Sequence, residues 1–201
     1  MPTARPGRVR VAVLISGAGS NMAALIDAAG QADAPFEVVL VLSNKPEAGG
    51  LAVAEAKGVS TAVVDHIPFG KDRAAHEQAI QTVLEAHGVE VVALAGYMRL
   101  LTPFLVGRWA GRMLNIHPSL LPKYPGLDTH ARAIAAGDAE AGCTVHLVAE
   151  GVDDGPVLGQ AAVPVLPGDT VETLAARVLI EEHQLYPRCL EALAADVAPP
   201  H

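Results

Sequence analysis

The chain of 201 residues has few aromatic residues, few cysteines and no run of basic residues. Aromatic residues make up only 3% of a sequence that is 51% hydrophobic, so the core must consist of Ala, Val, Leu and Ile. Such side chains suit helices packed on the buried strands of a parallel sheet. The length is enough for one well-buried domain and short for two, so we expect a single domain at residues 1–195 and a tail at residues 196–201.

The balance of charge is acidic, with a formal net charge of -8 at pH 7. Nucleic-acid binding needs clustered Lys and Arg to neutralise phosphates, so no nucleic-acid partner is expected. A small ligand with a phosphate group remains compatible with this charge, because backbone N–H groups can hold an anion without net positive charge.

The two cysteines, Cys143 and Cys189, are too few for a disulfide framework. We expect buried, reduced thiols in a cytosolic protein. A catalytic cysteine is the alternative, but the sequence places no obvious base beside either one.

No apolar stretch is long enough to cross a bilayer, so no membrane association is expected. The apolar residues from Val9 to Ile15 follow a basic start and resemble a signal peptide at first sight. Arg10 interrupts them, however, and they continue into a glycine-rich turn rather than a cleavage site. We interpret them as a first β-strand and predict a cytoplasmic location.

Strand and helix patterns alternate along the first 117 residues. Strands are expected at residues 9–16, 36–42, 61–65, 89–95 and 112–117, and helices at residues 22–29, 48–57 and 72–87. This alternation predicts an α/β fold with a doubly wound, mostly parallel sheet. Ser20 or Asn21 is expected to cap the first helix, and Gly58 and Gly88 to end the next two.

The pattern changes in the last third of the chain. Strands at residues 143–150 and 157–165 are joined by a short polar loop, which predicts an antiparallel hairpin added to the parallel sheet. Residues 170–195 are expected to form a long closing helix, with Pro187 as a possible bend.

A glycine-rich turn, SGAGSN at residues 16–21, connects the first expected strand to the first expected helix. Glycines let a ligand approach the backbone, and a helix start presents N–H groups to an anion. A dinucleotide site would have a third glycine at Met22 and an acidic residue after the second strand, which instead ends in Ser-Asn-Lys. The turn therefore suits a single phosphate group, and a tight turn with a helix cap is the alternative.

The segment MLNIHPSLLP at residues 113–122 carries a polar pair at the end of an expected inner strand. Asn115 and His117 are two residues apart, so they point to the same side of the sheet, while Leu114 and Ile116 face the core. Open α/β sheets bind ligands at this edge. An amide beside an imidazole suits acyl chemistry through an oxyanion, and a structural Asn with a partly buried His is the alternative.

Two acidic residues, Asp153 and Asp154, lie in the loop of the expected hairpin. A carboxylate near His117 would favour the charged imidazole and orient its ring. Turn chemistry is the alternative, and these considerations alone do not bring the loop to the strand.

The remaining histidines show no convincing metal-ligand spacing, so no metal site is expected and each is interpreted as structural or exposed. No G-x-S-x-G motif is present, which argues against a serine hydrolase. The histidines concerned are His66, His76, His87, His130, His146 and His183.

Taken together, these segments resemble the phosphoribosylglycinamide formyltransferases, which transfer a formyl group from 10-formyltetrahydrofolate to glycinamide ribonucleotide in purine biosynthesis. The matching stretches, in family order and over nearly the whole chain, are VLISGAGSNMAALIDA, LAGYMRLL, LNIHPSLLPKYPG, GCTVHLVAEGVDDGPVLGQAAVPV and EEHQLYP.

The resemblance implies roles for individual residues. It implies that Asn115, His117 and Asp153 form a catalytic trio. The implied binding residues are Gly19, Ser20 and Asn21 for the ribonucleotide phosphate, Glu182 for the rest of that substrate, and Arg73, Met98, Arg99, Leu100, Leu101 and Asn115 for the folate.

The reaction implied by the resemblance is direct attack of the glycinamide amine on the formyl carbon. Asn115 and protonated His117 would stabilise the oxyanion, and Asp153 would support the charge on His117. Asp154 and Leu179 depart from the residues that many relatives carry there, so the loop backbone and one substrate contact are expected to differ.

Other formyltransferase-fold enzymes are the competing interpretations. Formyltetrahydrofolate hydrolases carry an additional domain before the catalytic one, whereas this sequence begins directly at the first strand. Methionyl-tRNA formyltransferases have a further basic C-terminal domain, whereas this sequence is acidic. A non-catalytic nucleotide- or folate-binding module is the alternative from another class. For the oligomeric state, monomer and homodimer both stay open.

Overall fold

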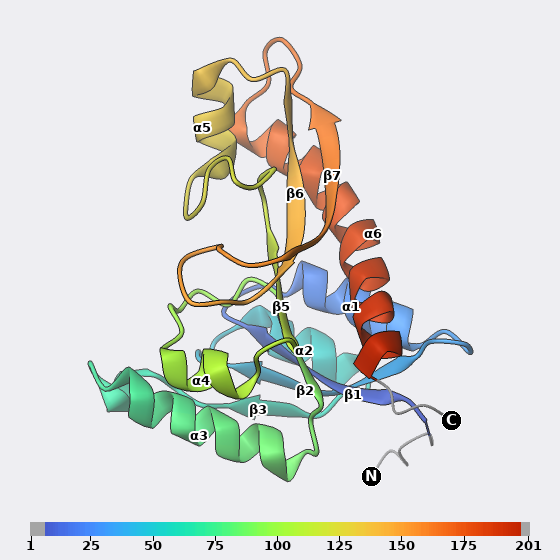
Figure 1. Ribbon diagram of the computed structural model, residues 1–201, viewed down its shortest axis with the longest axis vertical. Coiled ribbons are helices and arrows are strands. Elements are labelled where there is room, and N and C mark those ends of the chain that lie inside the picture. Colours follow the sequence, from blue (N-terminus) through green and yellow to red (C-terminus); the bar gives the residue numbers. More distant parts are fainter. Residues whose placement is uncertain (1–6, 198–201) are drawn as a thin grey trace.

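The structure is a computed structural model that describes residues 7–197. One sheet of seven strands runs through it, in the order β3-β2-β1-β4-β5-β6-β7 (Figure 1). Neighbouring strands from β3 to β5 are parallel, and β6 and β7 are antiparallel additions at one edge. The strands are β1 (Val9–Ile15), β2 (Phe36–Ser43), β3 (Thr61–Val63), β4 (Val91–Leu94), β5 (Met113–His117), β6 (Glu140–Leu147) and β7 (Val157–Pro164).

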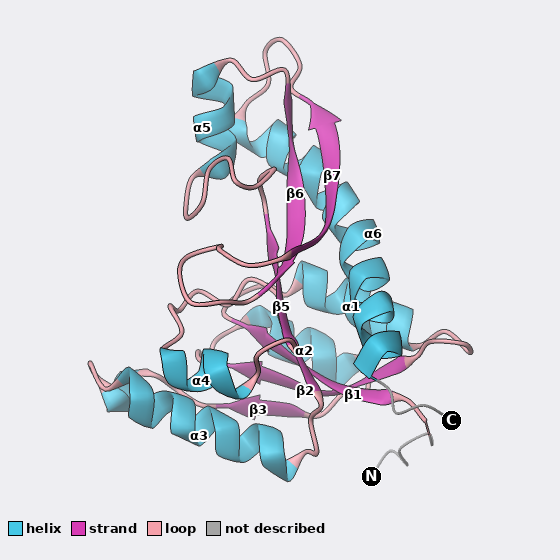
Figure 2. Ribbon diagram, in the orientation of Figure 1, coloured by secondary structure: helices cyan, strands magenta, loops and turns pink. Residues whose placement is uncertain are grey.

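Helices cover both faces of the sheet (Figure 2). The helices α1 and α6 pack on each other, and residues of both belong to one core cluster, whereas α3 and α4 contribute to a second cluster on the other face. The helices are α1 (Ser20–Ala29), α2 (Gly49–Ala56), α3 (Arg73–Ala86), α4 (Pro103–Arg108), α5 (Thr129–Ala136) and α6 (Val171–Val197), with a short 3-10 helix at Ile67–Phe69.

The strand β1 shows why the sequence forms this sheet. Its residues are apolar apart from Arg10, and Val11 and Val13 join one core cluster while Ala12 and Leu14 join the other. A strand buried on both faces must be apolar at successive positions, which is the pattern of a central parallel strand. The predicted doubly wound sheet with its antiparallel hairpin and closing helix is confirmed.

Several local predictions differ from the structure. The N-cap of α1 is Gly19, at φ 74°, and neither Ser20 nor Asn21 caps the helix because both lie in its first turn. The helix α6 continues to Val197, so the first two residues of the predicted tail are helical and residues 198–201 lie outside the described part. The helices α4 and α5 were not predicted, because both are short, and α5 in addition follows a proline-rich segment.

The closing helix α6 is tied to the centre of the sheet by Tyr186. This fully buried side chain donates its hydroxyl to the carbonyl oxygens of Leu94 (2.8 Å) and Leu114 (3.2 Å). A buried hydroxyl needs such partners. These bonds therefore fix α6 against Leu94, at the end of β4, and against Leu114 of β5, the residue before Asn115.

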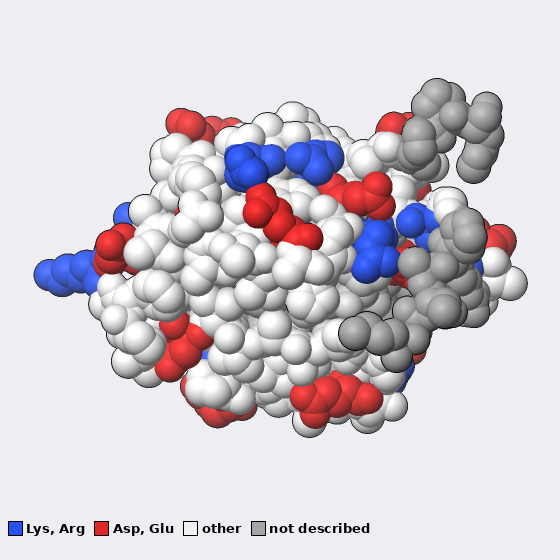
Figure 3. Space-filling view, turned by 90° about the horizontal axis from the view of Figure 1, so that it is seen from below, with Lys and Arg blue, Asp and Glu red and all other residues white. Residues whose placement is uncertain are grey.

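Charges on the surface are mixed. On the face in Figure 3, Lys and Arg side chains lie beside Asp and Glu, and uncharged residues cover most of the area. Within residues 7–197, every helix is too short or too polar to cross a bilayer.

Candidate functional site

Polar side chains gather at the carboxyl ends of β1, β4 and β5. The strand β1 pairs with β2 on one side and with β4 on the other, so the order of strands reverses at this point. Ligands of open α/β sheets bind in the crevice at such a reversal. Both predicted polar features, the glycine-rich turn after β1 and the Asn-x-His pair on β5, lie at this edge.

Asn115, His117 and Asp153 lie together. The Nδ1 atom of His117 is 3.3 Å from Oδ2 of Asp153, and Nδ2 of Asn115 is 3.5 Å from the other carboxylate oxygen. His117 is only 5% exposed. The structure therefore brings the loop between β6 and β7 to the end of β5, which strand geometry alone did not predict.

Both nitrogens of the His117 ring face oxygen atoms. Nε2 is 2.9 Å from the carbonyl oxygen of Tyr124, which can only accept a hydrogen bond. Nδ1 faces the carboxylate of Asp153. Each ring nitrogen of His117 therefore has an acceptor oxygen within reach, and these two contacts fix the direction of the ring.

Asp153 is held as an anion. Burial by itself would raise its pKa, but the His146 ring, the N–H of Gly126 (2.8 Å) and the charge of His117 outweigh burial, so the pKa of Asp153 lies below its ordinary value. Its backbone has φ 51°, a left-handed conformation that costs free energy in a residue with a side chain. The loop keeps this conformation while directing the carboxylate at His117.

His146 is a member of this cluster that sequence reasoning missed. It pairs with Asn115 across the antiparallel strands β5 and β6 and is 2% exposed. Its Nδ1 lies 2.9 Å from the carbonyl oxygen of Leu147, and its Nε2 lies 3.2 Å from Asn115 Nδ2 and 3.8 Å from Asp153 Oδ1. His146 thus orients the Asn115 amide. Its only sequence signal was a histidine in an expected strand, and the register that places it beside Asn115 was not predictable.

The glycine-rich turn opens directly into α1. The first helical hydrogen bond runs from Ala23 N to Gly19 O (2.9 Å), so the N–H groups of residues 20–22 precede the helical ladder. Gly19 adopts φ 74°, where a Cβ would come within 3.1 Å of the backbone of Gly50. A glycine is therefore required here, and the turn presents a helix N-terminus suited to an anion.

Two residues predicted separately, Asn21 and Glu182, contact each other across α1 and α6. Asn21 Nδ2 donates to Glu182 Oε2 at 2.6 Å. Burial raises the pKa of Glu182, against the opposing effect of this hydrogen bond. Asn21 Oδ1 is buried and has no hydrogen-bond partner among the described residues, so an acceptor is left for a ligand.

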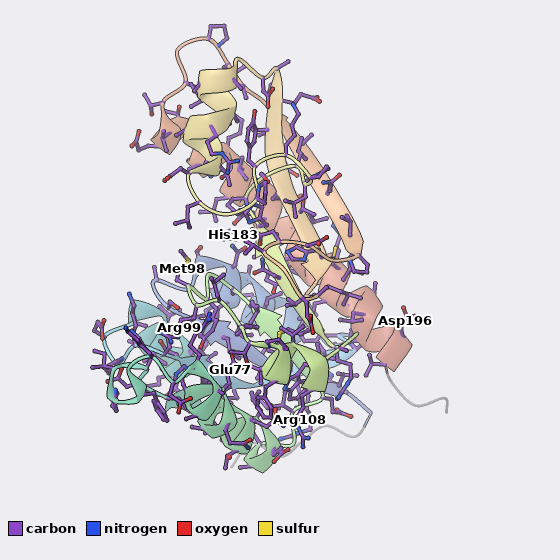
Figure 4. All side chains as sticks on the ribbon, turned by 60° about the vertical axis from the view of Figure 1, so that its left-hand side comes forward. Glu77, Met98, Arg99, Arg108, His183 and Asp196 are labelled. Atoms are coloured by element: carbon purple, nitrogen blue, oxygen red, sulfur yellow. The ribbon has the colours of Figure 1, made fainter. Side chains whose placement is uncertain are left out.

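The loop between β4 and α4 carries most of the predicted folate residues. Ser16 accepts the N–H of Met98 at 2.8 Å, and buried Glu77 on α3 accepts both the N–H (2.7 Å) and the hydroxyl of Thr102. Figure 4 shows Met98 and Arg99 on this loop, with Glu77 beneath it. Both ends of the loop are fixed, while Met98 and Leu100 are exposed by 63% and 60%. The fixed loop exposes apolar side chains that a planar ligand can cover.

The other predicted residues are less constrained. Arg73 begins α3, is exposed, and its side chain makes no hydrogen bond within residues 7–197.

Cys143 and Cys189 are free and buried, and burial raises the pKa of the Cys143 thiol to about 12. They are buried thiols, as predicted, and not nucleophiles. Residues 7–197 contain no group of three or more His, Cys, Asp or Glu arranged to hold a metal.

The doubly wound sheet with its antiparallel strands is shared with known proteins. The formyl transferase family matches residues 9–190, and the chain belongs to this family. Its predicted resemblance to phosphoribosylglycinamide formyltransferases is confirmed. The protein of that name from Haemophilus influenzae is 46% identical over 178 residues, which are 89% of this chain and 84% of that protein.

A solved structure supports the same assignment. Phosphoribosylglycinamide formyltransferase from Brucella melitensis is 57% identical, with a TM-score of 0.90 over 94% of this chain and 96% of that one. The trifunctional purine biosynthetic protein adenosine-3 of Bos taurus is 48% identical over 191 residues. The chain spans only 19% of the length of that protein.

Proposed function

We propose that this protein transfers the formyl group of 10-formyltetrahydrofolate to the amine of glycinamide ribonucleotide, a step of purine biosynthesis. The observation that carries this proposal is the cluster of Asn115, His117 and Asp153, one strand away from the β4–α4 loop and across the sheet edge from the glycine-rich turn. The high identity to phosphoribosylglycinamide formyltransferases over most of both chains supports it.

The proposed ribonucleotide site uses the turn before α1. Gly19, Ser20 and Asn21 would hold the phosphate through helix N-terminal N–H groups, which favour an anion. Glu182 lies 2.6 Å from Asn21 and would accept hydrogen bonds from the glycinamide part of the substrate. The unpaired Oδ1 of Asn21 adds a second acceptor.

The proposed folate site uses the β4–α4 loop. Met98, Arg99, Leu100 and Leu101 would line it, and Asn115 would meet the formyl group at the end of β5. Exposed Arg73 would approach the acidic part of the folate as a cation. The chemical character of this loop suits the folate, because the loop combines exposed apolar side chains with a fixed backbone.

The proposed chemistry is direct attack of the amine on the formyl carbon. The oxyanion that forms would take hydrogen bonds from Asn115 and from the His117 imidazolium. His117 Nε2 contacts the carbonyl oxygen of Tyr124, and the oxyanion would share this donor with it, because hydrogen bonds to ions are about twice as strong as those to neutral groups. Asp153 would keep the charge on His117. Collapse of the oxyanion would break the bond between the formyl carbon and the folate nitrogen, and a water molecule would relay the proton from the attacking amine to that leaving nitrogen.

The test is an absorbance assay for deformylated folate, run with and without glycinamide ribonucleotide, together with thermal unfolding in the presence of each substrate. We expect turnover only when both substrates are present. Turnover without the ribonucleotide would instead identify a hydrolase, and binding without turnover would identify a non-catalytic module. A single domain over residues 1–195 and a cytoplasmic location are part of the same proposal.

A further inference from the structure

The loop at residues 118–126, between β5 and α5, supplies two backbone groups to the Asn-His-Asp cluster. The carbonyl oxygen of Tyr124 lies 2.9 Å from His117 Nε2, and the N–H of Gly126 donates to Asp153 at 2.8 Å. Both partners of the His117–Asp153 pair therefore depend on the same short stretch of backbone. A shift of this loop would change the direction of the imidazole and of the carboxylate together.

This stretch of backbone is held in an unfavourable conformation. Tyr124 has φ 55° and Gly126 has φ 79°. A left-handed conformation costs a residue with a side chain on the order of 1 kcal/mol or more, so other contacts must hold Tyr124 there.

Asp138, outside the cluster, supplies such a contact. Its Oδ2 accepts the hydroxyl of Tyr124 at 2.8 Å, and its Oδ1 pairs with Lys123 Nζ at 3.0 Å. The backbone N–H of Asp138 donates to Ala133 O (3.2 Å), which fixes Asp138 at the end of α5. These bonds from Lys123 and Tyr124 lower the pKa of Asp138, and the same contact raises the pKa of Tyr124.

Helix stability does not explain an aspartate at this place. Asp138 follows Gly137, the C-cap of α5, where the helix dipole disfavours a negative charge. On the same helix, Arg132 lies over the Tyr124 ring at 5.0 Å from its centroid and donates to Pro125 O at 2.7 Å. Arg132 on α5 and Asp138 just beyond its end thus hold the Tyr124 ring from two directions.

We propose that Asp138 is a positioning residue for the reaction at His117. By fixing the Tyr124 ring, Asp138 fixes the backbone that His117 and Asp153 contact. Asp138 itself touches no substrate. The expected change in kcat rests on the proposed function, because that reaction is the one measured. The position of the His117 ring, in contrast, can be observed without any substrate.

The first experiment compares Asp138→Ala, Asp138→Asn and Tyr124→Phe in steady-state assays. Misplacing a reacting group by about 1 Å can cost on the order of a hundredfold in rate, so for a partial shift in Asp138→Ala we expect kcat to fall about tenfold. The KM values for both substrates should change less than about threefold, because this contact lies away from the proposed binding residues. Asp138→Asn keeps one acceptor and should restore part of the rate. Tyr124→Phe removes only the hydroxyl and should resemble Asp138→Ala.

The matched control is Asp27→Asn, which breaks another aspartate–lysine pair, with Lys57, on the opposite end of α1 from the glycine-rich turn. It should leave kcat unchanged. If Asp27→Asn and Asp138→Ala lower kcat equally, or if Asp138→Ala has wild-type kcat, the positioning role is wrong.

The second experiment needs no turnover. In protein with ¹⁵N-labelled histidine, the ring nitrogens of His117, assigned with a His117→Asn variant, should shift in Asp138→Ala and in Tyr124→Phe. Alkaline absorbance should show the pKa of the Tyr124 phenol moving down towards its ordinary value of about 10 in Asp138→Ala. Unchanged His117 signals in both folded variants would overturn the inference. An inactive wild type with shifted His117 signals would instead reject the proposed function and leave the positioning role intact.

Discussion

The two halves of the candidate site are built in different ways. The glycine-rich turn is contiguous: residues 16–21 run from the end of β1 into the first turn of α1, and only Glu182 comes from far along the chain. The Asn-His-Asp cluster draws on β5, the loop at residues 118–126, β6 and the loop before β7. A helix start suffices for an anion site, whereas an ion pair in a fixed direction needs several chain segments.

The two regions also treat their buried carboxylates in opposite ways. Burial raises the pKa of Glu182, whose side-chain partner among residues 7–197 is the neutral amide of Asn21. Asp153 is surrounded by N–H donors and a cation, so its pKa is lowered despite burial. The difference shows that partners, and not burial alone, decide the direction in which the pKa of a buried carboxyl group shifts.

The largest expected effect is at the cluster. His117→Ala and Asn115→Ala should each lower kcat on the order of a hundredfold or more, because each removes a donor to the oxyanion. Thermal unfolding should show that both variants fold. The control is His87→Ala at the C-cap of α3, which removes an imidazole whose ring bonds, among residues 7–197, only to Val83 O. Wild-type turnover in either cluster variant would remove that residue from the mechanism.

A smaller effect is expected at Glu182, beside the glycine-rich turn. Glu182→Gln should raise the KM for the ribonucleotide about tenfold with little change in kcat, because hydrogen bonds to a charged group contribute about 1.5–3 kcal/mol. The neighbouring Glu181→Gln lies on a different side of α6 and is the matched control. Equal changes in both variants would show that only the charge of the helix matters.

The next prediction concerns how far the backbone conformation of Gly19, in the glycine-rich turn, constrains the side chain at that position. Gly19→Ala should destabilise the fold by about 1–2 kcal/mol, because its φ of 74° and the close approach of Met22 and Gly50 disfavour a side chain. Gly17→Ala is the control, since nothing lies within 4 Å of its Cβ position. Thermal unfolding should give a lower midpoint for Gly19→Ala only. Equal midpoints would mean that the turn relaxes at no cost.

The smallest effect concerns the dependence of stability on pH. The pKa of Asp153 is lowered on folding, so its stabilising contribution is present above the ordinary carboxyl value of about 3.9 and is lost as pH falls through the lowered value. The pKa of Glu182 is raised, so its contribution is present below about 4.3 and is lost as pH rises through the raised value.

Asp153→Asn and Glu182→Gln should therefore change the slope of unfolding free energy against pH in opposite directions. Denaturant unfolding at several acidic pH values measures both slopes. Slopes of the same sign would contradict the contrast between the two regions.

Much of this arrangement was predictable because its signals are local. The apolar run of β1 and the glycines after α2 and α3 indicated the doubly wound sheet, and Gly58 and Gly88 adopt the left-handed conformation expected after a helix. The glycine-rich turn was placed correctly, although its cap residue is Gly19. The short helices α4 and α5 carry too few turns to show a period, so they were missed.

What the sequence by itself determined is the order of strands and helices and the side-chain chemistry at two strand ends, because hydrophobic period and glycine placement act over a few residues. Only the tertiary structure decided that β6 runs antiparallel beside β5, which brings His146 to Asn115. It also decided that Asp153 meets His117 and that Asp138 holds Tyr124. Those contacts depend on strand register and loop backbone, which are set by packing across the whole chain and leave no periodic trace in the sequence.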